Sequence, residues 1–292
     1  MHKFFANSTI KRYFTQNIYL NTSKGHTNVL AWVTSLQARG IQAFSVKHAR
    51  EALAGQTETA IRRALDRLSA KGTLISLHKG YYLIIPPQYS ARGILPPPLF
   101  LDGLMNYLER PYYVGLLNAA SFHGASHQQP QEYYVFTGFP VLRPLKKKNV
   151  KVNYISKKEI PDLLLEKRKT ETGFLTISSP ELTAADLLRF DKRIGGLNRA
   201  ATVLDELSEA INPEKFTTDF FKAVQDTTIQ RLGYLLDKVL KKTSIAEQLF
   251  EQSKKEGSHF YRIPLKTSAP IKGFTSDEKW KVIVNTQIEM DE

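Results

Sequence analysis

Residues 44–87 read FSVKHAREALAGQTETAIRRALDRLSAKGTLISLHKGYYLIIPP, and this stretch decides the fold of the N-terminal part of the chain. Its first part predicts a helix over 44–55, with Ser45 as N-cap. After the short loop AGQT, the second part predicts a helix over 56–72 that Thr57 caps. Ile61, Leu65 and Leu68 recur at helical spacing in this second helix, which predicts one buried face.

The residues on either side complete the pattern. Residues 73–87 hold two strand-like runs around His78-Lys79-Gly80, which predicts a hairpin that stops at two prolines. Upstream, TNVLAWVTSLQARG (27–40) predicts a helix that ends at a glycine. Three helices followed by a hairpin, with a short loop between the second and third, are the order of a winged helix-turn-helix.

In such a domain the third helix lies in the DNA major groove, with its N-terminal residues at the base edges. We expect Arg63 to contact guanine, with Gln56 and Thr59 beside it. Asp66 also faces outward and either pairs with Arg62 or accepts from a cytosine amino group, of which the intrahelical pair is favoured. The predicted DNA-binding residues are Lys47, Arg50, Gln56, Thr57, Thr59, Arg62, Arg63, Arg67, Lys71, His78 and Lys79.

The charge distribution supports a polyanionic partner. The chain carries a net charge of +13, of which residues 1–95 contribute +10, from 13 Lys and Arg against three Asp and Glu. A second basic run, RPLKKKNVKVNYISKK (143–158), holds seven cations and no acid. Its Lys146, Lys147, Lys148 and Lys151 form either a surface for an acidic protein or RNA, or a turn kept soluble by lysine.

The sequence predicts four regions: an N-terminal extension (1–27), the winged domain (28–90), a proline-rich linker (91–98) and a larger C-terminal domain (99–292). In the last region, 102–124 contains two helical patterns broken at Pro111. Strands are expected over 132–138 and 150–156. Residues 174–190 predict a strand, a turn and a helix, with Ser178 or Ser179 as N-cap and Pro180 at or near the first helical position. Helices are expected over 198–211, 216–225 and 228–240, and a β pattern over 280–292. The fold class is therefore α+β, with a C-terminal domain that is mostly helical after residue 180.

No motif in the chain indicates catalysis or cofactor binding. His123 and His127 lie four residues apart, but Gly124 stands where a zinc protease has glutamate. No third metal ligand is evident among His2, His26, His48, His78 and His259. We therefore expect His123 and His127 to be structural, hydrogen-bonded around the turn that follows.

Other enzyme classes are equally unsupported by the sequence. Asp162 and Glu166 lie on one stretch, PDLLLEKRK (161–169), for which we expect a salt-bridged helical surface rather than a nuclease site. The chain lacks a P-loop, a G-x-S-x-G motif and any cysteine. It also lacks an apolar run long enough to span a membrane and a continuous signal-peptide core, so a cytoplasmic location is expected.

Four further stretches carry a family resemblance. They are YYVGLLNAASFHGASHQQPQEYYVFTG (112–138), FLTISSPELTAADLLRF (174–190), GGLNRAATVLDEL (195–207) and IPLKTSAPIKGFTSDEKWKVIVN (263–285). In this order, with the winged domain before them, they resemble AbiEi-family antitoxins over about residues 28–288. Residues 1–27 lie outside the shared pattern.

The resemblance implies an antitoxin of a bacterial type IV toxin–antitoxin or abortive-infection system, with a role in phage defence. It implies a winged helix that binds repeats in its own promoter, with possible cooperative self-association, and represses transcription. It also implies a C-terminal domain that counteracts a nucleotidyltransferase-like toxin without forming a stable complex. The alternatives are a nucleic-acid-processing enzyme and an interaction module that binds the toxin directly.

Overall fold

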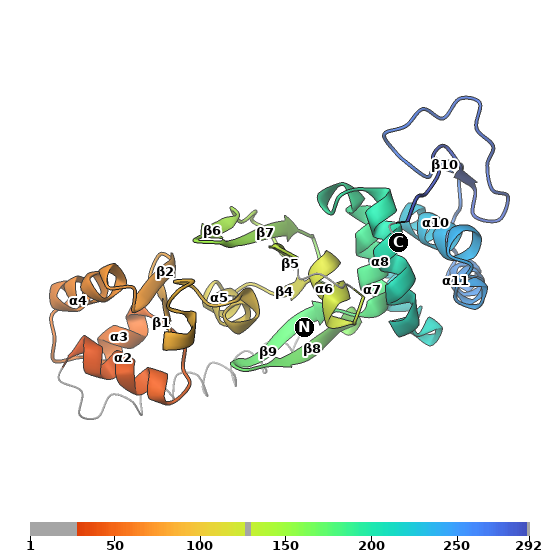
Figure 1. The fold of residues 1–292 in the computed structure, drawn as a ribbon. Coiled ribbons are helices and arrows are strands. Elements are labelled where there is room, and N and C mark those ends of the chain that lie inside the picture. The colour runs from red at the N-terminus through yellow and green to blue at the C-terminus, as the bar shows by residue number, and fades with distance from the viewer. Residues whose placement is uncertain (1–27, 126–129, 291–292) are drawn as a thin grey trace. The chain divides into compact units, whose positions relative to one another are not determined.

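A computed structural model describes residues 28–125 and 130–290, so the predicted extension 1–27 and His127 lie outside the described residues. The chain divides into two compact units (Figure 1). The first runs to Arg110 and includes residues 144–152 and 169–174; the second comprises 111–143, 153–168 and 175–292. Both helices and sheets are present, which confirms the α+β fold class.

The first unit contains the three helices and the hairpin that the sequence predicts. Its elements are α2 (Val29–Ala38), β1 (Ala43–Ser45), α3 (Val46–Ala52), α4 (Glu58–Ala70), β2 (Leu74–His78), β3 (Tyr81–Ile84) and α5 (Leu101–Tyr107). The strands form one antiparallel sheet in the order β1-β3-β2, in which β1 is an additional strand that periodicity did not reveal.

Local hydrogen bonds define where these helices begin. Ser45 and His48 form a capping box at α3, and the Thr57 hydroxyl accepts from the Ala60 backbone at α4. Both N-caps are those that the sequence predicts. Gly72, with φ +75°, follows α4 in the left-handed conformation that ends helices.

The core of the first unit lies where the apolar stripes of its helices meet. Trp32 and Phe44 pack edge to face with ring centroids 4.9 Å apart. Ile61 and Leu65 of α4 are at most 1% exposed and join the same cluster, and Leu68 is also buried. The inward face of α4 is therefore the face that its periodicity predicts.

The first unit extends beyond the segment predicted as a linker, because α5 packs on the hairpin. The Tyr107 ring stacks on Tyr81 at 4.8 Å, and its hydroxyl donates to the carbonyl of Lys79 at 2.9 Å. Val46 N–H donates to the carbonyl of Gly80, so the hairpin turn is held from two elements. Residues 91–110 consequently belong to the same compact unit as α4.

A six-stranded sheet has the strand order β6-β7-β5-β4-β9-β8, and its central strands β4 and β5 lie in the second unit. The six strands are β4 (Tyr112–Val114), β5 (Glu132–Thr137), β6 (Leu145–Lys147), β7 (Val150–Ser156), β8 (Leu165–Thr170) and β9 (Gly173–Ser178). The central strand β4 is antiparallel to β5 and parallel to β9. The parallel pair requires a crossover, which places long connections and helices on the sheet.

The helices of the second unit gather around α7 (Pro180–Arg189), which contacts α6 (Leu116–Phe122), α8 (Leu197–Leu207) and α10 (Asp226–Tyr234) (Figure 1). All residues of α7 from Pro180 to Leu188 are buried. Of the two serines that could cap this helix, Ser179 is the N-cap, and Pro180 occupies the first helical position. Beyond it lie α9 (Thr218–Ala223), a π-helical turn (Leu235–Val239) and α11 (Thr243–Lys255).

Three local predictions in this unit are wrong. Residues 112–114 form a strand and not a helix. The prediction fails here because a short run that is buried on both faces has no periodicity to distinguish a strand from a helix. Residues 161–170 form a 3₁₀ turn and strand β8, not a helix, because alternate side chains from Leu165 to Thr170 face solvent. Residues 145–147, predicted as part of a turn, form edge strand β6.

The C-terminal β pattern also gives less strand than predicted. Among the described residues of this stretch, only Val282–Ile283 (β11) forms a strand, and it pairs in parallel with Ile263–Pro264 (β10). The Asn285 side chain then donates to the carbonyls of Lys266 and Ala269 and thereby ends the pairing with a loop. Among the described residues, no helix has both the length and the apolar character needed to cross a membrane.

Candidate nucleic-acid interface

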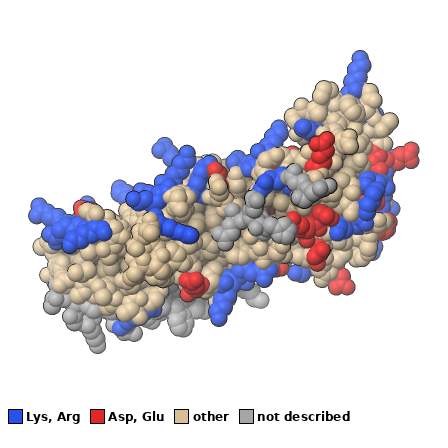
Figure 2. All heavy atoms as spheres, viewed as in Figure 1, with Lys and Arg blue, Asp and Glu red and all other residues tan. Residues whose placement is uncertain are grey.

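The outward face of α4 is basic. Arg62, Arg63, Arg67 and Lys71 are all exposed, while the opposite side of the helix is buried. Figure 2 shows Lys and Arg side chains gathered over this helix. Because DNA affinity depends on cations that reach phosphates, this face has the charge that a DNA-binding surface needs.

One acid organises two of the arginines. Glu58 Oε1 accepts from Arg50 of α3 and forms a 2.7 Å ion pair with Arg62, one turn further along α4. Within the described residues, Arg62 pairs with Glu58 and not with Asp66, so the predicted Asp66–Arg62 pair is wrong. In the same part of the chain Arg63, Arg67 and Lys71 form no ion pair, which leaves their charges available.

The other residues predicted to contact DNA differ in how accessible their side chains are. Lys47 is exposed, 3.9 Å from Glu51, and Thr59 is exposed at the N-terminal end of α4. The Thr57 hydroxyl is already engaged in capping, and Gln56 is half-buried. Of the residues predicted at the start of α4, Thr59 is therefore the most accessible to a base.

His78 and Lys79 lie at the hairpin turn and are exposed, as a wing tip requires. The turn itself is tight. Gly80 has φ +78°, and a Cβ at this position would lie 2.9 Å from the Tyr107 hydroxyl. The backbone that presents Lys79 is thus held in place by α5.

The second predicted basic surface lies on the edge strand β6 and the turn after it. Lys146 and Lys148 are exposed, whereas Lys147 and Lys151 are half-buried. Lysine on a short edge strand discourages pairing with a strand of another molecule. This structural role accounts for the lysines as well as a binding role does.

His123, singled out in the sequence as half of a metal pair, is a structural link. Its Nε2 lies 2.8 Å from the carbonyl of Ser178, and its Nδ1 lies 3.0 Å from Arg168 Nη2. Since the guanidinium can only donate, Nδ1 accepts and Nε2 carries the proton. Burial lowers the pKa of His123, although the hydrogen bond to the carbonyl of Ser178 acts to raise it. The neutral ring joins α6 to β8 and β9.

A buried polar network lies at the centre of the second unit. The Tyr113 hydroxyl donates to Asp186 Oδ2 at 2.7 Å, and Lys157 Nζ donates to the same hydroxyl at 2.9 Å. Lys157 also lies 3.5 Å from Asp186 Oδ1. Burial raises the pKa of Asp186 despite the nearby ammonium, and burial raises the pKa of Tyr113 well above its usual value. The network cross-links β4, α7 and the segment after β7.

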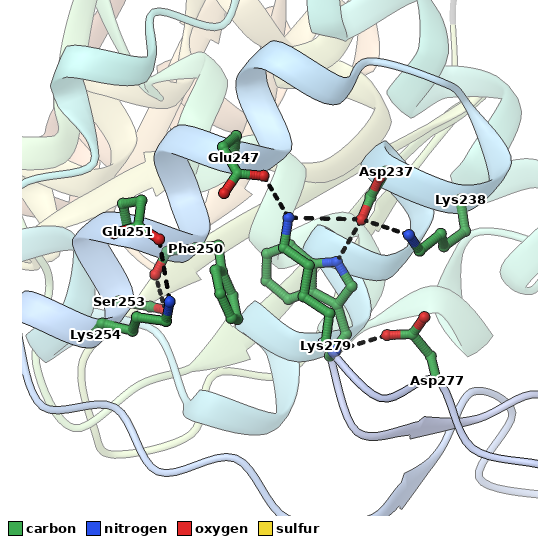
Figure 3. A network of polar contacts seen from close by, with 10 residues as sticks. Asp237, Lys238, Glu247, Phe250, Glu251, Ser253, Lys254, Asp277 and Lys279 are labelled. Carbon is green, nitrogen blue, oxygen red and sulfur yellow. Dashed lines mark hydrogen bonds and ion pairs between the residues drawn. The ribbon is translucent and has the colours of Figure 1, made fainter.

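A second network joins the C-terminal segment to the helices (Figure 3). Trp280 is fully buried, and its indole N–H donates to Asp237 Oδ2 at 3.1 Å. Lys238 and Lys279 also pair with Asp237, and Lys279 reaches Glu247 at 2.6 Å. Burial opposes the charge on Asp237, but the hydrogen bonds from Trp280 and Lys238 hold its pKa below the usual value.

The carboxylates considered for a nuclease are not assembled as a metal site. Asp162 lies in a 3₁₀ turn, where burial raises its pKa. Glu166 on β8 pairs with Lys215 at 3.3 Å and with Arg168 at 3.5 Å. Across residues 28–125 and 130–290, no group of three or more His, Asp or Glu side chains is placed to hold a metal ion.

Comparison with known proteins gives structural likenesses and a family match. The crystal structure of RV2827C protein from Mycobacterium tuberculosis matches with a TM-score of 0.61 and 17% identity. The match covers 86% of this chain and 89% of that one, and at this identity it shows a shared fold. No curated protein matches the chain.

The family match falls within the second unit. Residues 113–238 match the model of the AbiEi antitoxin C-terminal domain. They include His123, the Tyr113–Asp186–Lys157 network and α6 to α10. The stretch 263–285, which also carries the resemblance in the sequence, lies outside the matched residues. Residues 113–238, less than half of the chain, are therefore similar to the AbiEi antitoxin C-terminal domain.

Proposed function

We propose that this protein is the antitoxin of a bacterial type IV toxin–antitoxin pair and represses its own promoter. The family of residues 113–238 supports the antitoxin role. In this proposal residues 28–90 are a winged helix-turn-helix that binds DNA repeats. The C-terminal domain counteracts a nucleotidyltransferase-like toxin without a stable complex.

The observation that carries the DNA-binding proposal is the exposed face of α4. Arg63 and Arg67 lie on α4, Lys71 caps its C-terminal end, and none of the three forms an ion pair within the described part of the chain. The elements around it follow the order expected of a winged helix-turn-helix, helix, strand, helix, helix and hairpin. In this arrangement Arg63 contacts guanine, with Gln56 and Thr59 beside it. The cations Arg62, Arg67, Lys71, Lys47, Arg50, His78 and Lys79 contact phosphates.

The test is retardation of the DNA upstream of the gene by the full-length protein. The double variant Arg63→Ala/Arg67→Ala should lose binding at a salt concentration where the unaltered protein is half saturated. The matched control is Lys222→Ala/Lys255→Ala, which removes two exposed cations of α9 and α11. Undiminished binding by the arginine variant would exclude α4 as the DNA-binding helix.

Salt dependence gives an independent measure of the same contacts. Each phosphate neutralised contributes about −0.9 to the slope of log affinity against log salt. Because Arg63 is assigned to a base and Arg67 to a phosphate, the single variants should differ: Arg67→Ala should change the slope by about 0.9, and Arg63→Ala should mainly relax sequence preference.

The antitoxin role is tested by growth. Expression of this protein should restore growth to cells that express the neighbouring nucleotidyltransferase gene. The Arg63→Ala/Arg67→Ala variant should restore growth equally when both genes are driven by foreign promoters, because its antitoxin domain is intact. A toxin that stays lethal under these conditions would contradict the proposal.

A second possibility is direct contact through Lys146 and Lys148, which are exposed on and beside β6. Their partner would be an acidic toxin surface or the RNA that the toxin modifies. Pull-down with the neighbouring gene product at increasing salt separates the two routes. A salt-stable complex would contradict indirect neutralisation, and its loss in Lys146→Ala/Lys148→Ala would assign the contact to this surface.

A further inference from the structure

Glu58 is an acidic residue at a position where a surface that binds DNA by charge alone would not carry an acid. It is the first residue of α4, directly after the N-cap Thr57, and its side chain is 51% exposed. Residues at the start of a recognition helix are those that reach base edges. A carboxylate here repels phosphate, so its presence on the basic face calls for a specific role.

The geometry holds this carboxylate in one orientation. Arg50 from α3 and Arg62 from α4 both bind the same atom, Glu58 Oε1. No hydrogen bond to Oε2 occurs among the described residues, so one carboxylate oxygen is fixed and the other is available. Two guanidinium groups on one oxygen also offset the repulsion between Glu58 and DNA phosphates.

We propose that Glu58 determines sequence specificity by accepting a hydrogen bond at Oε2 from the amino group of a cytosine in the major groove. This inference rests on the proposed DNA-binding function. Adenine, guanine and thymine each present an acceptor in the major groove, which repels a carboxylate. Cytosine presents only its N4 amino donor there. A clamped carboxylate therefore selects cytosine.

This assignment differs from the one that the sequence suggested for Asp66. Asp66 lies more than two helical turns after Glu58, away from the N-terminal end of α4. Its charge raises the pKa of Tyr82 on β3, after the larger effect of burial, and Arg62 lowers it. Asp66 is thus the matched control, an exposed acid on the same helix that should not contact a base.

The experiment is selection from a pool of randomised DNA duplexes by the full-length protein. The unaltered protein should enrich a site with cytosine at one position, at roughly tenfold preference, in line with the discrimination of a good base contact. In Glu58→Gln the preference at that position should move from cytosine to adenine, because glutamine donates to N7 and accepts from N6 of adenine. Asp66→Asn should retain the original site.

Glu58→Asp provides a second variant that keeps the charge. It should weaken the cytosine preference without moving it to adenine, because the shorter side chain cannot keep both the arginine contacts and the base contact. Thermal unfolding of each variant verifies that the first unit is folded. A folded Glu58→Gln variant that selects the same site, or that binds no DNA, would overturn the specificity role.

The two proposals fail in distinguishable ways. If the unaltered protein enriches no sequence and does not retard the upstream DNA, the DNA-binding function itself is wrong. If it enriches a site that Glu58→Gln enriches equally, DNA binding stands and only the role of Glu58 is wrong.

Discussion

Gly233 of α10 allows Trp280 to pack against the helix, and replacing it with alanine should destabilise the second unit. A Cβ at this position would lie 2.0 Å from Trp280 Cζ3 and 2.1 Å from Cη2, far inside contact distance. The indole is fully buried and the helix is backed by α7 and α11, so the ring has to leave its site. In an unhindered helix the same change would be favourable by about 1 kcal/mol.

The magnitude follows from what the displaced ring loses. Removal of a buried Phe or Trp side chain from a core costs about 3–5 kcal/mol. Trp280 would also lose its hydrogen bond to Asp237. After subtraction of the helical gain of alanine, Gly233→Ala should lower the free energy of unfolding by about 2–4 kcal/mol.

Urea unfolding followed by tryptophan fluorescence measures this effect, since the chain has two tryptophans and Trp280 reports on the second unit. Gly138→Ala is the control, because its Cβ would meet no atom within 4 Å and it should be nearly neutral. With circular dichroism as the signal, because the substitution removes the fluorescent indole, Trp280→Phe should cost less stability in the Gly233→Ala background than alone. A Gly233→Ala variant as stable as the unaltered protein would refute the packing argument.

Three further predictions concern buried titratable groups. Burial lowers the pKa of His48 to about 4, so between about pH 4 and 6.5 the unfolded chain binds more protons than the folded one. The first unit should therefore lose thermal stability as the pH falls through this range, and His48→Gln should remove this dependence. A pH-independent melting temperature in the unaltered protein would contradict the prediction. Asp186→Asn leaves the Lys157 ammonium buried without its carboxylate and should cost about 3 kcal/mol in urea unfolding, of which Lys157→Met in the same protein should restore a part. His123 should show the Nε2-protonated neutral tautomer in nitrogen NMR at pH 7, and a doubly protonated ring at that pH would disprove the Ser178–Arg168 arrangement.

What the sequence predicts well is local. Ser45, Thr57 and Ser179 cap helices as expected, because capping depends on residues within one turn of the chain. The inward face of α4 follows from periodicity alone. The family resemblance in 112–138 is likewise a local pattern, and the family model that matches residues 113–238 includes nearly all of that stretch.

What the sequence does not predict depends on distant partners. Strand β4 exists because β5 and β9 pair with it on both sides, and nothing in Tyr112–Val114 itself excludes helix. The sequence does not single out Glu58, because its second partner, Arg50, lies in another helix. The spacing of four residues between Glu58 and Arg62 was the available signal, since it is typical of a helical ion pair.

The packing of α5 on the hairpin also determines where the chain can be cut. A fragment that stops at residue 98 would lack Tyr107, expose the ring of Tyr81 to water and release the Lys79 carbonyl. A fragment that ends after Arg110 keeps these contacts. The smallest fragment that keeps these contacts should therefore include α5, which lies beyond the prolines. Protease digestion of the intact protein should leave the peptide bonds of 91–98 uncut, because these residues belong to the same compact unit as α4.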